Sequence, residues 1–233
     1  MIDRYTRPEM GRIFSLENKY AIWQEIEVLA CEAHAELGEN GITKKEAKWI
    51  RDHAAFDRAE VDELEAVTNH DVIAFLTNMG AYVDRDVPEG DPKPSRWIHY
   101  GMTSSDLGDT ALCYQLTQAC DLIIEDVRAL GALCKRRAFE ERDTPCVGRT
   151  HGIHAEPMTF GMKFGSWAWE LRRDLDRLLD ARRGVAVGAI SGAVGTYSSI
   201  DPRVEAYVCG HLGLDFDPLS TQVISRDHHA YLA

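Results

Sequence analysis

Apolar residues recur at steps of three and four along most of the chain. Side chains with this spacing lie on one face of a helix, so the pattern predicts a largely helical fold. It is clearest between residues 16 and 37, where Ser15 precedes the pattern as a candidate N-cap and Gly38 follows it as a stop. The apolar positions of this first predicted helix are Leu16, Tyr20, Trp23, Ile26, Ala30, Ala33 and Leu37.

Shorter helices are predicted next. Two of them begin with a capping side chain three residues before an acidic one, a pattern that satisfies free amide N–H groups at a helix start. A further helix is predicted from Asp71 to Val83. The two capping pairs are Thr43 with Glu46 and Asp57 with Glu60.

A proline-rich segment follows these helices. Residues 84–95 (DRDVPEGDPKPS) combine three prolines with alternating charge, which is typical of a solvent-exposed linker. We therefore expect a domain boundary here. The prediction is an amino-terminal helical domain over residues 1–95 and a second domain over residues 96–233.

The second domain is predicted to contain two long helices. Ser104, Ser105 or Asp106 can cap the first, and the next proline is Pro145, which allows about 35 residues or roughly 50 Å of helix. The second is predicted over about residues 157–183. Helices of this length are typical of a bundle, and no alternating apolar pattern of useful length predicts a sheet. The predicted fold class is therefore all-α, with the amino-terminal domain followed by part of a long-helix bundle.

The last part of the sequence predicts two more helices. Asp201 and Pro202 supply an N-cap and a first-turn proline for a short helix that stops at Gly213. A final helix is predicted to begin near Arg226 and reaches Ala233 without a stop signal. We therefore expect the sequence to be a fragment of a longer polypeptide.

Charge and composition narrow the function classes. The net charge of −12, from 26 basic and 38 acidic residues, argues against a nucleic-acid-binding surface, which is normally basic. Six cysteines without a C-x-x-C pair indicate reduced thiols and a cytoplasmic location. The amino terminus is charged from its third residue, and no apolar run approaches the ~18 residues of a membrane span. We therefore expect neither a signal peptide nor a membrane partner.

Five stretches break the helical pattern with polar residues that packing alone would not select. They combine arginine, histidine, hydroxyl and carboxylate side chains, and an anionic small molecule is still possible as a ligand where basic residues cluster. The stretches are RYTRPEM (4–10), TNHDV (68–72), HYGMTSSDLGDTA (99–111), GRTHGIHAEPMTFG (148–161) and STQVISRD (220–227).

The pair His151 and His154 admits three interpretations. A metal site needs further ligands, and no nearby segment offers a second His/Cys pair. Both could be hydrogen-bonded histidines in a tight turn. The third interpretation is acid/base catalysis: Gly148 and Gly152 allow the backbone to approach a ligand, and a histidine suits proton transfer near neutral pH. We favour the third for His151.

The residues of the other stretches could also have purely structural roles. Asp71 could cap a helix while His70 is merely exposed. The hydroxyls of residues 103–105 could be caps only, or could form an anion site at a helix start for a carboxylate. Arg4 and Arg7 are ordinary surface residues unless a ligand engages them.

In order and spacing, the polar stretches resemble the fumarase/aspartase superfamily, and within it the branch that acts on adenylosuccinate. The segment SGAVGTYSSIDP (191–202) joins them, so the resemblance covers essentially the whole chain. The GRTHG and TSSD segments are similar across the superfamily. The RY start and the T-x-H-D segment are similar to the adenylosuccinate branch in particular.

The resemblance implies a β-elimination that releases fumarate from adenylosuccinate, giving AMP, and from the succinylated aminoimidazole carboxamide ribotide of purine biosynthesis. It implies no metal and no organic cofactor. It also implies a homotetramer with shared active sites, in which the long helices form a central bundle.

The same resemblance implies roles for individual residues. His151 matches the general acid, and His70 matches a histidine that assists it or contacts phosphate. Thr103 and Ser104 match residues that bind the succinyl group. The other matches are substrate or nucleotide contacts: Arg4, Tyr5, Asn69, Asp71, His99, Thr150 and Gln222.

One expected motif is missing from these 233 residues. The S-S-x-M-P-x-K-x-N-P loop, which carries the serine expected to act as base, does not occur in them. We therefore expect the chain alone to lack lyase activity. Two alternatives stay open: another fumarate-releasing lyase, such as one acting on argininosuccinate, and a non-catalytic helical oligomer.

Overall fold

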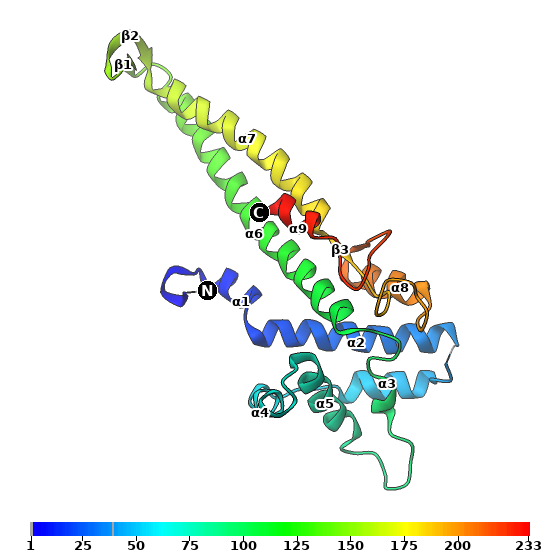
Figure 1. The fold of residues 1–233 in the computed structure, drawn as a ribbon. Helices are drawn as coiled ribbons and strands as arrows, with labels where there is room; N and C mark the ends of the chain where they lie inside the picture. The colour runs from blue at the N-terminus through cyan, green and yellow to red at the C-terminus, as the bar shows by residue number, and fades with distance from the viewer. Residues whose placement is uncertain (1, 39) are drawn as a thin grey trace. The chain divides into compact units, whose positions relative to one another are not determined.

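The computed structural model describes residues 2–38 and 40–233 and is mostly helical (Figure 1). The all-α prediction is confirmed. Two short 3-10 helices, η1 (Asp3–Tyr5) and η2 (Pro94–Trp97), accompany the α-helices. In chain order, the α-helices are α1 (Pro8–Ile13), α2 (Leu16–Leu37), α3 (Lys44–His53), α4 (Arg58–Thr68), α5 (Asp71–Asp84), α6 (Ser104–Glu140), α7 (Phe160–Val185), α8 (Pro202–Leu212) and α9 (Arg226–Leu232). Within the described residues, no helix has the length and apolar character needed to cross a membrane.

The predicted helix signals lie where the helices begin and end. Ser15 caps α2 by accepting the Asn18 N–H at 3.2 Å, and α2 stops at Gly38 in the left-handed conformation. Thr43 and Glu46 form the expected capping box at the start of α3. Local hydrogen bonding therefore sets these boundaries, as the sequence predicts.

Short strands are the main departure from the prediction. β1 (Pro145–Thr150) pairs antiparallel with β2 (Ile153–Thr159), and β3 (Val187–Gly188) pairs parallel with β4 (Asp215–Phe216). The helix expected from Pro157 therefore begins only at Phe160, because the residues before it pair with β1. The hairpin is largely exposed on both faces, so it lacks the apolar alternation that predicts a half-buried strand.

The chain divides into two compact units. The first contains the residues up to Thr117 together with Val185–Tyr231, and the second is Gln118–Gly184. Helix α6 contributes residues to both. The domain boundary expected near residue 95 stays a prediction, and the residues on both sides of it belong to the first unit.

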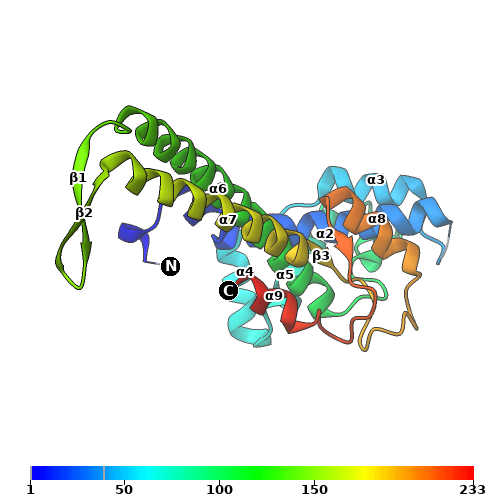
Figure 2. The same ribbon diagram turned by 90° about the horizontal axis from the view of Figure 1, so that it is seen from above.

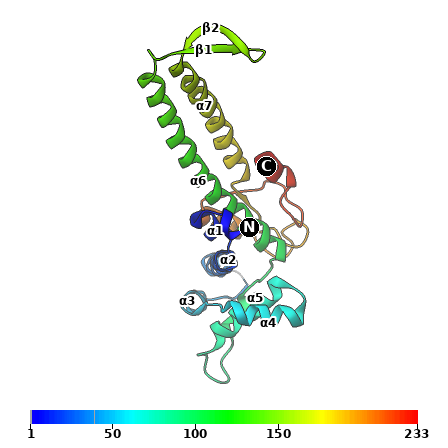
Figure 3. The same cartoon turned by 90° about the vertical axis from the view of Figure 1, so that its left-hand side faces the viewer.

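The first unit is built around α2. Helices α3 and α8 pack against α2. Helix α4 packs against α5 (Figure 3). Trp23 and Ile26 of α2 are buried with Ile50 of α3 and Met79 of α5, and the ring of Tyr20 is also buried. Burying each such side chain contributes roughly 1.5–3 kcal/mol. This core includes residues of α4, α5 and α6, and the ends of these helices carry five of the eleven candidate site residues.

The second unit is a helix pair with a hairpin. Residues 118–140 of α6 run beside α7, and the β1–β2 hairpin connects them at one end (Figures 1 and 2). The Arg182 guanidinium joins the helices through Asp121 at 2.6 Å, and Gly131 lies close to Leu171. Large apolar side chains remain exposed on the pair: Leu130, Leu133, Phe139, Trp167 and Trp169.

Candidate functional site

The turn between α4 and α5 carries three predicted site residues. Asn69 ends α4 in the left-handed conformation. His70 is the N-cap of α5, because its Nδ1 accepts the Ile73 N–H at 3.4 Å, so the capping residue is not Asp71. The Asp71 carboxylate instead accepts a hydrogen bond from Lys19 Nζ at 3.1 Å. A neutral histidine whose Nδ1 accepts carries its proton on Nε2, so the turn presents a half-exposed N–H donor.

His99 is held by a buried carboxylate. Its backbone N–H donates to Glu27 Oε2 at 2.7 Å, and its ring Nδ1 lies 2.6 Å from Glu27 Oε1. Glu27 is fully buried, whereas 19% of the His99 side chain is exposed. Burial acts to lower the pKa of His99, but the hydrogen bond and charge of Glu27, together with the charge of Asp106, outweigh it and raise the pKa. His99 is therefore biased toward its cationic form.

Asp106 connects the start of α6 to the segment of residues 191–202. Its buried carboxylate accepts three backbone N–H groups, from Thr103 and Gly192 at 3.0 Å and from Ser191 at 3.1 Å. Burial raises the pKa of Asp106 to about 6, although these hydrogen bonds and the charge of His99 act to lower it. Helix α6 begins at Ser104, so Ser104 and Asp106 lie in its first turn. The first amide N–H groups of a helix have no partner within the helix, and the hydroxyls of residues 103–105 lie beside them, so this helix start can bind an anion.

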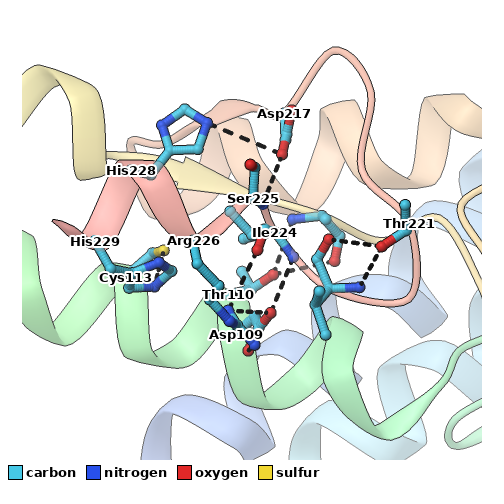
Figure 4. A network of polar contacts seen from close by, with 12 residues as sticks. Asp109, Thr110, Cys113, Asp217, Thr221, Ile224, Ser225, Arg226, His228 and His229 are labelled. Atoms are coloured by element: carbon cyan, nitrogen blue, oxygen red, sulfur yellow. Dashed lines mark hydrogen bonds and ion pairs between the residues drawn. The ribbon is translucent and has the colours of Figure 1, made fainter. Parts of the chain in front are cut away.

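The segment that carries Gln222 is clamped to α6 (Figure 4). The Asp109 carboxylate accepts the Ile224 N–H at 2.9 Å and pairs with the Arg226 guanidinium at 2.8 Å. Gln222 lies two residues before this clamp and is exposed. The clamp therefore fixes the backbone from which the Gln222 amide projects.

His151 lies at the tip of the β1–β2 hairpin, in the second unit. Thr150 pairs with Ile153, and the turn between them is closed by His151 and Gly152, both with positive φ. Thr150, His151 and His154 are all exposed. The hairpin therefore displays His151 and leaves its ring accessible to a ligand.

Arg4 and Tyr5 lie at the amino terminus in η1. The Arg4 guanidinium lies 4.7 Å from the centre of the Tyr5 ring, and both side chains are exposed. A cation stacked on an aromatic face is a surface that a nucleotide base or phosphate can engage.

The structure joins only some of the predicted residues. His99 and Thr103 meet through Asp106, whose charge acts on the first and whose carboxylate binds the second. The candidates of η1, the α4–α5 turn and the Gln222 segment belong to the first unit, whereas Thr150 and His151 belong to the second. Within the described ranges, no cluster of three or more His, Cys, Asp or Glu side chains could hold a metal ion.

Backbone conformation singles out three of the candidates. Asn69, His99 and His151 have positive φ, which non-glycine residues rarely adopt. Among the residues that the structure describes, the other such positions are Asn40 and Tyr197. Strained backbone concentrates at functional sites, so this observation supports the choice of these three.

Sequence reasoning missed the buried acids that organise the site. Glu27 was hidden in the first helix between Ile26 and Val28, and its position inside an apolar run was the available signal. Glu205 is also buried: it accepts the Ile190 N–H at 2.7 Å and the Tyr197 hydroxyl at 2.8 Å. Periodicity locates the buried face of a helix, but it does not say which partner a buried carboxylate binds.

A family model described as "Lyase" matches residues 3–233. The chain is 48% identical to an adenylosuccinate lyase of Bacillus subtilis over 100% of its length and 52% of the relative's. It is 50% identical to an adenylosuccinate lyase of Synechocystis over 99% of its length and 51% of the relative's. The chain therefore spans about half the length of these curated relatives.

Solved structures of the same architecture are also similar. A fumarate lyase from Mesorhizobium superposes with a TM-score of 0.85 at 26% identity, over 95% of this chain and 51% of that one. A 3-carboxy-cis,cis-muconate lactonizing enzyme from Pseudomonas putida gives a TM-score of 0.83 at 29% identity, over 94% of this chain and 50% of that one.

Proposed function

Because the chain belongs to the lyase family whose model matches residues 3–233, we propose that it supplies part of an enzyme that eliminates fumarate from adenylosuccinate, giving AMP. The second proposed substrate is the succinylated aminoimidazole carboxamide ribotide. The observation that carries the proposal is the 45–50% identity to three adenylosuccinate lyases over 99–100% of the chain.

The reaction needs a base and an acid. The base removes a proton from the carbon beside one succinyl carboxylate, and the extra charge collects on that carboxylate as an aci-carboxylate. The carbon–nitrogen bond then breaks, and the acid delivers a proton to the departing nitrogen. The products are fumarate and the purine amine, so protons and electrons balance without a cofactor.

We assign the acid to His151. The exposed hairpin tip, where Gly152 follows His151 with positive φ, supports a role in which the ring enters a substrate site. His70 assists it or contacts phosphate through the half-exposed Nε2–H. The base is assigned to a serine of a loop that these 233 residues do not include.

The substrate contacts are assigned by the same logic. The carboxylates of the succinyl group bind at the start of α6, where Thr103 and Ser104 offer hydroxyls beside free helix amides. The remaining contacts, to the nucleotide or the substrate, are Arg4, Tyr5, Asn69, Asp71, His99, Thr150 and Gln222.

A cytoplasmic homotetramer with shared active sites is part of the proposal. All six cysteines are free thiols, which suits a reducing compartment. Exposed Trp167 and Trp169 on the α6–α7 pair support burial of that face against other copies, because monomeric proteins rarely expose large apolar patches.

The test of the acid is the variant His151→Gln in the full polypeptide that carries these residues. If His151 is the proton donor, fumarate release from adenylosuccinate falls by about 100-fold or more. His154→Gln is the matched control, because His154 lies on the same hairpin, and it should keep turnover within about threefold of the unchanged protein. A loss below threefold in His151→Gln would remove His151 from the role.

The proposal as a whole is tested by substrate. Adenylosuccinate and argininosuccinate are offered separately to the full polypeptide, and fumarate is measured. Fumarate release from argininosuccinate alone would refute adenylosuccinate as the substrate. The 233 residues by themselves should release fumarate from neither, since the expected serine loop is not among them.

A further inference from the structure

Glu27 occupies an unusual position for a carboxylate. It lies on α2, the central helix of the first unit, and its side chain is fully buried. A buried carboxylate is costly unless it is hydrogen-bonded or paired. Both of its oxygens are engaged by one residue, His99, through the backbone N–H at 2.7 Å and ring Nδ1 at 2.6 Å.

This arrangement fixes how His99 is presented. A carboxylate is an acceptor, so Nδ1 of His99 must carry a proton. The second nitrogen, Nε2, is on the other side of the ring, and 19% of the side chain is exposed. Among the described residues, no hydrogen bond to Nε2 is recorded in the structure, so that nitrogen is available to a ligand.

We propose that Glu27 is a positioning residue that holds His99 as a cationic donor, with Nδ1–H bound to Glu27 and Nε2–H aimed at an anionic group of the substrate. The inference rests on the proposed function for the identity of that substrate. The anionic group is a phosphate or a carboxylate, since both accept from an imidazolium in the same way.

Two charged groups from different helices face the ring. Glu27 comes from α2 and Asp106 from the first turn of α6, and both favour the cation. Their combined effect exceeds the penalty of burial, so the pKa of His99 is raised. A cationic donor forms a stronger hydrogen bond to an anion than a neutral donor does.

The variant Glu27→Gln separates this role from simple packing. Glutamine has the same shape and keeps one oxygen for the backbone N–H of His99. Its NH₂ group can only donate, so it favours a neutral ring whose Nδ1 accepts. The variant therefore keeps the fold and removes the condition that makes His99 a cation.

The experiment uses the full polypeptide and two kinds of measurement. Exchange of the His99 ring C2 hydrogen, followed by mass spectrometry across pH, reports its titration directly. Binding of AMP, which has a phosphate, and of fumarate, which has carboxylates, measured by titration calorimetry, reports which anion His99 contacts. Glu36→Gln is the matched control, because Glu36 is exposed on the same helix and pairs with Lys44.

Glu27→Gln should move the titration of His99 to lower pH. It should also weaken the binding of AMP or fumarate by about 10-fold, with a smaller change in kcat. The same weakening should vanish in a His99→Gln background, because Glu27 acts through His99. An unchanged titration, unchanged binding of both anions, or an equal effect in the His99→Gln background would each overturn the proposal. If the unchanged protein releases no fumarate while the titration and binding shifts appear, the proposed function fails and the role of Glu27 stands.

Discussion

His99 combines a positive φ of 63° with two hydrogen bonds to one buried carboxylate. A non-glycine residue in this conformation costs of order 1 kcal/mol or more, and the bonds to Glu27 offset that cost. Conformation and charge at this residue are therefore set by the same partner. The consequence is a pH-dependent contribution to stability.

The pH dependence follows from the raised pKa of His99. A group whose pKa is raised by folding contributes stability that is present below its unfolded value and is lost as pH rises through the folded value. Glu27→Gln should therefore cost roughly 1–2 kcal/mol in the free energy of unfolding at pH 6 and less at pH 9. Denaturant unfolding at both pH values measures this. An equal penalty at the two pH values, or a pH-dependent penalty in Glu36→Gln, would contradict it.

Gly101 gives a second prediction at this scale. Its φ is 75°, and a Cβ there would overlap the carbonyl oxygen of Ser199. Gly101→Ala should therefore reduce the free energy of unfolding by roughly 2 kcal/mol or more. Gly108→Ala, within α6 and with open space around it, should instead be neutral or stabilise by about 0.5–1 kcal/mol. Thermal unfolding of the two variants checks both signs, and similar losses in both would refute the steric explanation.

Residue types at the site were predictable where a local pattern encodes them. The hydroxyls at the start of α6 and the glycine beside His151 could be read from the sequence, because capping and turn chemistry act over three or four residues. The partner of His99 could not. Glu27 is 72 residues from His99, and only packing of separate helices brings such groups together.

Helices were predictable as elements because their signals are local. Ser15, Thr43 and Asp201 each cap the helix that follows them, as the sequence predicts. The β1–β2 hairpin was not predicted, since its strands are exposed and carry no apolar alternation. Its two-residue turn at His151 and Gly152 depends on positive φ at both positions. A histidine in the sequence does not predict positive φ, because non-glycine residues rarely adopt it.

The contribution of Asp109 to holding the Gln222 segment against α6 can be tested by mutation. Asp109→Asn leaves a side chain that binds the Arg226 guanidinium poorly and can accept from Ile224 with only one oxygen. The segment should therefore open more easily, by about 1–2 kcal/mol, and amide exchange over residues 221–229 should accelerate roughly 5- to 30-fold.

Asp121→Asn is the control for this clamp. It also removes an arginine pair of α6, but the pair joins α6 to Arg182 of α7 in the second unit. Exchange over residues 221–229 should not change in this variant. Equal acceleration in both variants would mean that a general loosening of α6 governs the segment.

At the scale of the whole molecule, we propose that the active site combines groups from more than one copy of the chain. The α6–α7 pair exposes a groove of about 650 Å³ lined by Phe139, Trp169, Leu171 and Leu175. An apolar groove between two helices is a surface that a further helix can fill. If the groove is the tetramer interface, the shared sites depend on it.

Trp169→Glu in the full polypeptide tests this dependence. Trp169 is 69% exposed on the groove, and burying a carboxylate there against another copy costs several kcal/mol. Light scattering should therefore show a mass below that of the tetramer, with fumarate release lost in parallel. Ala81→Glu is the control, because Ala81 is exposed near the end of α5 in the first unit and should leave mass and turnover unchanged. A Trp169→Glu protein that stays tetrameric would exclude this groove as the interface, and a fully active monomer would exclude shared sites, because each copy would then contain every group that the elimination requires.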